Sequence, residues 1–218
     1  MMSGMEALAF ILENKVTKLQ YQRMRNNAIR RHANIYPAYN EVRAWKKLIL
    51  PPNIKISAKD CSVSIQDTLD HQLESLLKDE NLLDRCRRFC EMDNIRLSLI
   101  AKYGCDGFSA NAFYKGLGFS QKSVCASTLV LVSIKAINTV TNKSCIVWVN
   151  SRVNSPYAVC PLRYCFEKEN KVFSVAEGKR LERQVQNLKP FYRIGLCIDY
   201  QLYPTQVDGK STLFCSHL

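Results

Sequence analysis

The sequence changes character near residue 93, and this change constrains the fold more than any other feature. Before it, apolar residues such as Ile65, Leu69 and Leu73 recur at helical spacing. After it, β-branched and aromatic residues are concentrated in segments that we predict to be strands: 96–103, 128–139, 144–150 and 192–203. Between the last two strands, Ser174 and Glu177 predict a capped helix. This order of elements predicts an α+β fold with a mixed sheet and helices packed against it.

The first fifty residues predict three helices. Ser3 followed by Glu6, and Thr17 followed by Gln20, are capping boxes that open two of them. A third spans 39–48 and stops before a pair of prolines, which cannot continue a helix. We therefore predict three regions, which are a basic helical region at 1–55, a helical linker region at 56–93 and a sheet-containing domain at 94–218.

The positive charge of the chain is concentrated near its N-terminus. The net charge is +12, and the segment from Val16 to Lys59 holds ten basic residues against one acid, Glu41. Such an excess favours a polyanionic partner, because each neutralised phosphate releases bound counterions. A solvated basic surface is the alternative, and an anionic membrane is a weaker one. If the partner is DNA, the expected contacts are Lys18, Arg23, Arg25, Arg30, Arg31, Arg43, Lys46 and Lys47.

Two aspartates stand at the ends of predicted strands, and each is followed by glycine. Asp106 follows the first strand and Asp208 the fourth. Two-metal phosphoryl transfer requires carboxylates held on rigid strand ends. The Asp-Gly pair is also a favoured hairpin turn, so spacing alone leaves both interpretations open.

The sequence around these aspartates resembles a known family. The run LIAKYGCDGFS at 99–109, then the segments 146–156, 160–170 and 206–210, are similar, in the same order, to the catalytic blocks of Transib transposases and the related V(D)J recombinase catalytic subunits. Short segments near residues 6, 17, 34 and 46 resemble the helical part that precedes those blocks. The resemblance spans nearly the whole chain.

The resemblance implies a basic helical region followed by an RNase H-like catalytic domain that cuts and joins DNA. It implies that Asp106 and Asp208 bind Mg²⁺ or Mn²⁺ and that Glu169 is an auxiliary acid. From the residues alone, Glu169 reads equally well as a solvent-facing acid in a charged turn. DNA, a second copy of the chain or a full-length transposase are the implied partners.

The sequence departs from the family after Asp208. The family completes its site with a glutamate on a helix far downstream, beyond a zinc-binding insertion, whereas this sequence ends ten residues after Asp208. We therefore expect an incomplete RNase H-like sheet, and an isolated chain that neither nicks DNA nor joins ends. Three alternatives stay open: one exon of a longer gene, a non-catalytic DNA-binding or transposase-inhibiting fragment, and a decaying element without a selected function.

The cellular location is predicted from the cysteines and from the implied function. Ten cysteines at irregular spacing, with no signal peptide, indicate a reducing compartment. No apolar run approaches the roughly 20 residues that span a bilayer, so no membrane partner is expected. A role on DNA predicts the nucleus, and otherwise the cytoplasm.

Overall fold

The structure is a computed structural model that describes residues 1–89, 95–109, 123–141, 143–155, 158–166, 170–193 and 195–205. The chain divides into two compact units, Met1–Pro51 and Pro52–Leu218. None of the helices in the described ranges is long and apolar enough to cross a membrane.

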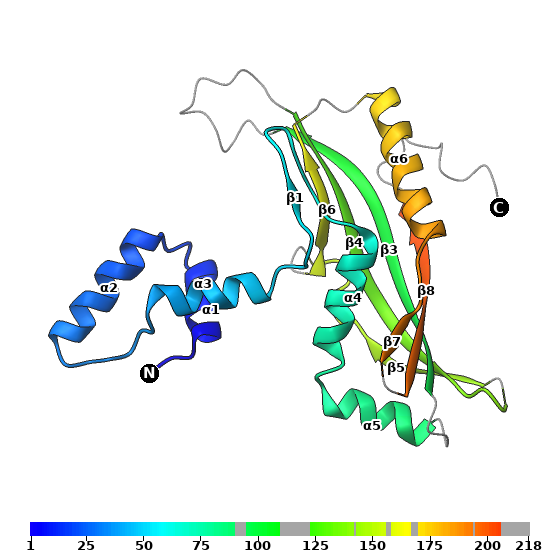
Figure 1. The fold of residues 1–218 in the computed structure, drawn as a ribbon, viewed down its shortest axis with the longest axis horizontal. Coiled ribbons are helices and arrows are strands. Elements are labelled where there is room, and N and C mark those ends of the chain that lie inside the picture. The colour runs from blue at the N-terminus through cyan, green and yellow to red at the C-terminus, as the bar shows by residue number, and fades with distance from the viewer. Residues whose placement is uncertain are drawn as a thin grey trace. The chain divides into compact units, whose positions relative to one another are not determined.

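The N-terminal unit contains three helices: α1 (Gly4–Glu13), α2 (Lys18–Arg30) and α3 (Tyr39–Leu48) (Figure 1). Both predicted capping boxes are present, because Ser3 and Thr17 each accept a hydrogen bond from the backbone three residues later. The three helices bury a small core around the fully buried Tyr21, with Ala7, Leu8 and Val42. The predicted helices are therefore confirmed.

The second unit begins with a short hairpin, β1 (Lys55–Ile56) and β2 (Asp60–Ser62), followed by α4 (Ile65–Leu76) and α5 (Glu80–Phe89). This segment covers most of the expected linker region at 56–93. Its hairpin joins the main sheet through β2, and Leu69 of α4 and Cys86 of α5 lie in the same core as the strands. Within the described residues, the expected linker is thus an integral part of the sheet unit.

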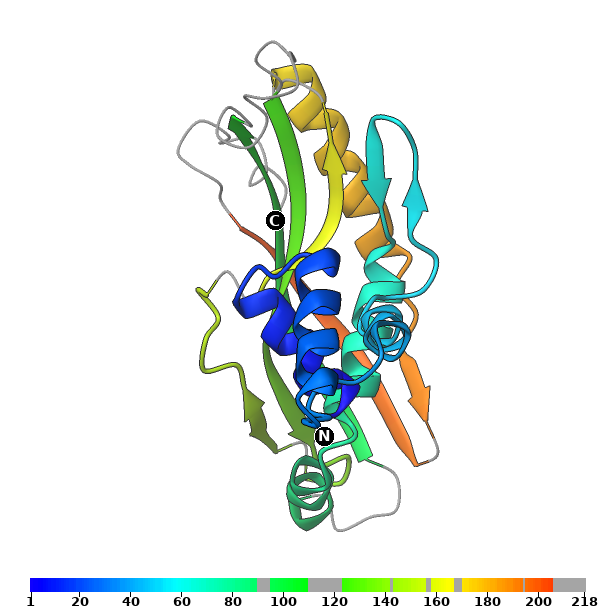
Figure 2. The same ribbon diagram turned by 90° about the vertical axis from the view of Figure 1, so that its left-hand side faces the viewer.

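Within the described residues, a mixed sheet of eight strands forms the body of this unit (Figures 1 and 2). Its remaining strands are β3 (Ile95–Ser109), β4 (Ser123–Ile137), β5 (Ser144–Val149), β6 (Cys160–Cys165), β7 (Phe191–Arg193) and β8 (Leu196–Pro204). The order is β1-β2-β6-β4-β3-β8-β7, and β5 also pairs with β4. The long strand β3 is antiparallel to β4 and parallel to β8. The predicted α+β class with a mixed sheet is confirmed.

Strand β6 was not predicted from the sequence, and its proline explains why. Pro161 stands second in this strand and has no backbone N–H for a ladder hydrogen bond. It pairs with Thr128, directly beyond an irregularity of register that follows Ser127. The irregularity accommodates a residue that otherwise argues against a strand.

The helix between β6 and β7, α6 (Lys171–Gln186), begins earlier than predicted. Its N-cap is Asn170, whose side chain accepts a hydrogen bond from the backbone N–H of Phe173 at 2.9 Å. Ser174 lies inside the helix and donates to the Asn170 carbonyl. The predicted capping box of Ser174 and Glu177 is wrong, because the helix begins one turn earlier at the Asn170 cap and already includes both residues.

The helices α4 and α6 cover one face of the sheet, here called the helix-covered face. Side chains of a strand alternate between faces, and Leu97, Leu99 and Tyr103 of β3 are buried in the core that includes Leu69 of α4 and Leu181 of α6. The even-numbered residues of β3 therefore lie on the opposite face.

Candidate acidic site and nucleic-acid interface

Asp106 lies inside strand β3, near its C-terminal end. It pairs with Ala126 of β4, and the following Gly107 pairs with Cys125, so neither residue forms a hairpin turn. The Asp106 side chain is exposed, on the face opposite the helix-covered face. The aspartate thus stands on a paired strand with its carboxylate open to solvent.

The chain end of β8 lies beside the segment that precedes Asp106. Pro204, the last residue of β8, pairs with Tyr103, and Thr205 then donates two hydrogen bonds to the Tyr103 carbonyl, from its backbone N–H at 2.7 Å and its hydroxyl at 3.0 Å. Asp106 follows Tyr103 by three residues, and Asp208 follows Thr205 by three residues. The parallel pairing therefore brings together the two chain segments that lead to the predicted acids.

Two of the three predicted acids, Asp208 and Glu169, lie outside the described residues. Within the described ranges, no group of three His, Cys, Asp or Glu side chains is placed to hold a metal ion. Asp106 is the one predicted ligand whose surroundings the structure defines. Its nearest basic neighbour along the same face of β3 is Lys102, which donates to the Asn154 side chain at 3.3 Å.

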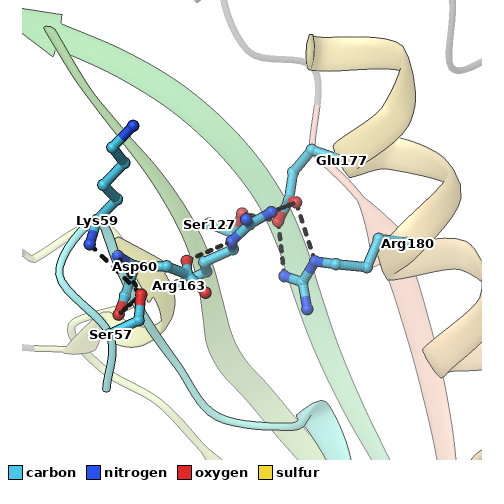
Figure 3. Close-up of polar contacts among 7 residues, drawn as sticks. All are labelled: Ser57, Lys59, Asp60, Ser127, Arg163, Glu177 and Arg180. Atoms are coloured by element: carbon cyan, nitrogen blue, oxygen red, sulfur yellow. Dashed lines mark hydrogen bonds and ion pairs between the residues drawn. The ribbon is translucent and has the colours of Figure 1, made fainter. Parts of the chain in front are cut away.

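A partly buried ion network lies on the other side of the sheet and consists of Asp60, Ser127, Arg163, Glu177 and Arg180 (Figure 3). Glu177 of α6 has 1% of its side chain exposed. Arg180 donates to its two carboxylate oxygens at 2.6 and 2.9 Å, and Arg163 donates at 2.5 Å. The Ser127 hydroxyl donates to the same carboxylate, and Arg163 also binds Asp60 at 2.6 Å.

The electrostatics of the network favour the charged forms of Glu177 and Arg163. Burial alone would raise the pKa of Glu177, but the hydrogen bonds from Arg180, Ser127 and Arg163 outweigh it and hold the pKa below its ordinary value. Burial would lower the pKa of Arg163, and its bonds to Asp60 and Glu177 reverse the direction and raise it. Two acids and two arginines balance, so no net charge is buried.

The network joins three strands to α6, and Asp106 lies on the opposite face of the sheet. Ser127 pairs with Cys105 of β3, and Cys105 points to the face opposite that of its neighbour Asp106. Both oxygens of Glu177 already accept two hydrogen bonds each. A sequence signal existed for this burial, because Glu177 precedes Leu181 and Val185 at intervals of four and so belongs to the apolar stripe of α6.

The basic residues of the N-terminal unit are largely solvent-exposed. Exposed side chains among those predicted to contact DNA are Lys18, Arg23, Arg30, Arg31, Arg43, Lys46 and Lys47. Arg25 differs, because it is half-buried and its Nε has no hydrogen-bond partner within the described residues. Helix α2 contains four cations and no acid. The unit therefore offers a polyanion a cationic helix surface that is not neutralised by acids of the same helix.

The chain matches no protein-family model, and no curated protein sequence matches it.

Proposed function

We propose that the chain derives from a DNA transposase or recombinase of the Transib type, with an RNase H-like domain and a basic helical region that binds DNA. The observation that carries the proposal is the pairing of β3 with β8. A first strand that is antiparallel to the next strand and parallel to the strand after a crossover helix is the start of an RNase H-like sheet. Asp106 and Asp208 follow the two hydrogen-bonded residues Tyr103 and Thr205 at equal intervals.

In this proposal Asp106 and Asp208 would hold Mg²⁺ or Mn²⁺, with Glu169 as the auxiliary acid. Carboxylate oxygens suit either cation, and Asp106 is exposed and so accessible to one. The proposed location is the nucleus.

Manganese binding tests the acidic site. Mn²⁺ titrated into the full chain is followed by its electron paramagnetic resonance signal, which is lost on binding. Asp106→Asn is expected to reduce the bound fraction by about tenfold at a fixed Mn²⁺ concentration, the effect typical of losing a site-supporting group. Glu74→Gln, at an exposed acid on α4, is the matched control and should bind as the unaltered chain does. Equal binding by Asp106→Asn and the unaltered chain would refute the site.

DNA binding is tested by fluorescence anisotropy with a duplex of arbitrary sequence over a series of salt concentrations. The logarithm of affinity should fall linearly with the logarithm of salt concentration, without a requirement for Mg²⁺. Alanine at Arg23, Arg30 or Lys47 should each lower that slope by about 0.9 if the residue contacts a phosphate. Lys143→Ala, at an exposed residue of the second unit, is the control. Unchanged affinity in all three variants would remove the basis for DNA binding.

A second candidate is a non-catalytic fragment that pairs with another copy or with a full-length transposase and inhibits it. Large apolar side chains that are more than half exposed favour it, and in the N-terminal unit they include Met5, Leu12, Leu19 and Leu48. Sedimentation equilibrium should give a dimer that Leu12→Glu together with Leu19→Glu converts to a monomer. A monomer at all concentrations would count against pairing.

A further inference from the structure

The solvent face of α2 has the chemistry of a surface that reads bases, and not only of one that neutralises phosphates. Tyr21, Met24 and Ala28 turn toward the unit's interior, whereas Arg23 and Asn26 are exposed on the opposite side of the helix. The exposed positions of this face hold Gln22, Arg23, Asn26, Asn27 and Arg30, with the apolar Leu19 at its N-terminal end. Amide side chains carry no charge, so the release of counterions from phosphates cannot explain why they occupy this face.

Guanidinium and carboxamide groups are the side chains that match base edges in the major groove. Arginine binds the two acceptors of guanine, and asparagine or glutamine binds the acceptor and donor of adenine. The absence of any acid from α2 means that no carboxylate of this helix opposes its entry between two phosphate backbones. The charge and the hydrogen-bonding groups of this face thus complement one polymer, double-stranded DNA.

The framework around α2 fits this use. Four residues separate α1 from α2, and Lys15 in that turn adopts a left-handed φ of 51°. Helix α3 contacts both α1 and α2 and so supports α2 from within the unit, and the recognition helices of DNA-binding domains enter the major groove from such a support. The inner side of α2 is fixed by Tyr21, whose hydroxyl donates to the Pro37 carbonyl at 2.9 Å and whose ring contacts those of Tyr36 and Tyr39. A helix held in this way presents its outer side chains in a defined arrangement.

From these features we infer that α2 is a recognition helix, in which Arg23, Asn26 and Asn27 read base edges in the major groove and make binding sequence-selective. The inference rests on the proposed DNA binding and specifies it. The exposed Lys46 and Lys47 of α3 serve as phosphate contacts that do not depend on sequence.

The experiment selects preferred sequences with the full chain from duplexes in which one helical turn, about 10 base pairs, is randomised. A short consensus should emerge after repeated rounds. Asn26→Ala with Asn27→Ala should lose about tenfold or more of the preference for the consensus over a random duplex, and keep its affinity for the random duplex. Lys46→Ala with Lys47→Ala should weaken binding to both duplexes alike. All four positions are exposed, and circular dichroism of the variants verifies that the helices persist.

The possible results distinguish failure of the recognition-helix inference from failure of the DNA-binding proposal on which it rests. Binding to random duplex without any enriched sequence overturns the recognition helix and leaves the DNA-binding proposal standing. A consensus whose preference survives in the Asn26 and Asn27 variant also overturns it. If the chain binds no duplex at all, the DNA-binding proposal itself fails.

Discussion

Replacement of Glu177 by alanine should destabilise the second unit more than any change at an exposed acid. The carboxylate is almost fully buried and accepts hydrogen bonds from Arg163, Arg180 and Ser127. Breaking a buried pair by removing one partner costs about 3–5 kcal/mol, because the other charge is left uncompensated. The two arginines have 24% and 26% of their side chains exposed and regain some hydration. We therefore expect a loss near the lower limit, about 3 kcal/mol.

Urea unfolding followed by tryptophan fluorescence measures this loss. Trp148 on β5 packs against the core of the second unit, and Trp45 belongs to the N-terminal unit, so a Trp45→Phe background makes the signal specific. With a denaturant slope of about 2 kcal/mol/M, Glu177→Ala should move the midpoint down by about 1.5 M. Glu74→Ala, at an exposed position of α4, is the matched control and should stay within about 0.5 kcal/mol. A Glu177→Ala midpoint equal to that of the control would refute the network's role.

Four other outcomes are expected. Because folding lowers the pKa of Glu177, the carboxylate contributes its full stabilisation above the unfolded pKa of about 4.5 and loses it as the pH falls through the folded pKa. The difference in unfolding free energy between the unaltered chain and Glu177→Gln should therefore shrink at acid pH. A difference that stays constant from pH 7 to pH 3 would contradict this. Tyr200→Phe should cost about 1 kcal/mol in urea unfolding, because its hydroxyl donates to Asp70 at 2.6 Å, and no change would mean that water replaces the bond freely. Ser3→Ala should lower the free energy of unfolding of the N-terminal unit by about 1 kcal/mol, seen as a lower melting temperature by circular dichroism. Asp106→Thr should stabilise the second unit by up to about 1 kcal/mol in urea, because threonine favours strands and aspartate does not, and a loss of stability would show that the aspartate is needed for folding.

The elements predicted correctly from sequence are those with a strong local signal. The capping boxes of α1 and α2 depend on residues three apart, and the structure contains both. The hairpin of β1 and β2 is too short for periodicity to show, since its strands have two and three residues. The position of β6 depends on its pairing with β2 and β4, which no local pattern encodes. The strands that were not predicted are therefore those whose position depends on pairing with strands distant in the sequence.

The acidic residues likewise include one that local sequence signals predicted and one that they did not. The position of Asp106 at the end of a strand followed from its β-rich surroundings, and the structure extends that strand three residues past it. The role of Glu177 was missed, because Ser174 and Glu177 match a capping motif by spacing alone. Its partner Arg180 lies one helical turn away, but its partners Arg163 and Ser127 are 14 and 50 residues away in the sequence. Only the folded sheet reveals those two distant partners.

Glu177 and Asp106 therefore differ in whether the stability of the fold explains their presence. The cost of burying Glu177 is offset by four hydrogen bonds and two guanidinium groups, so its presence follows from the stability of the sheet. Asp106 and Gly107 are both poor strand residues, yet they stand in the interior of a ladder opposite Ala126 and Cys125. Within the described ranges, no hydrogen bond or ion pair engages the Asp106 carboxylate. A residue that weakens its own strand and gains no partner there has no rationale in the folding of the described part of the chain. An exposed carboxylate on a paired strand suits a hard cation, so the manganese experiment is directed at this residue.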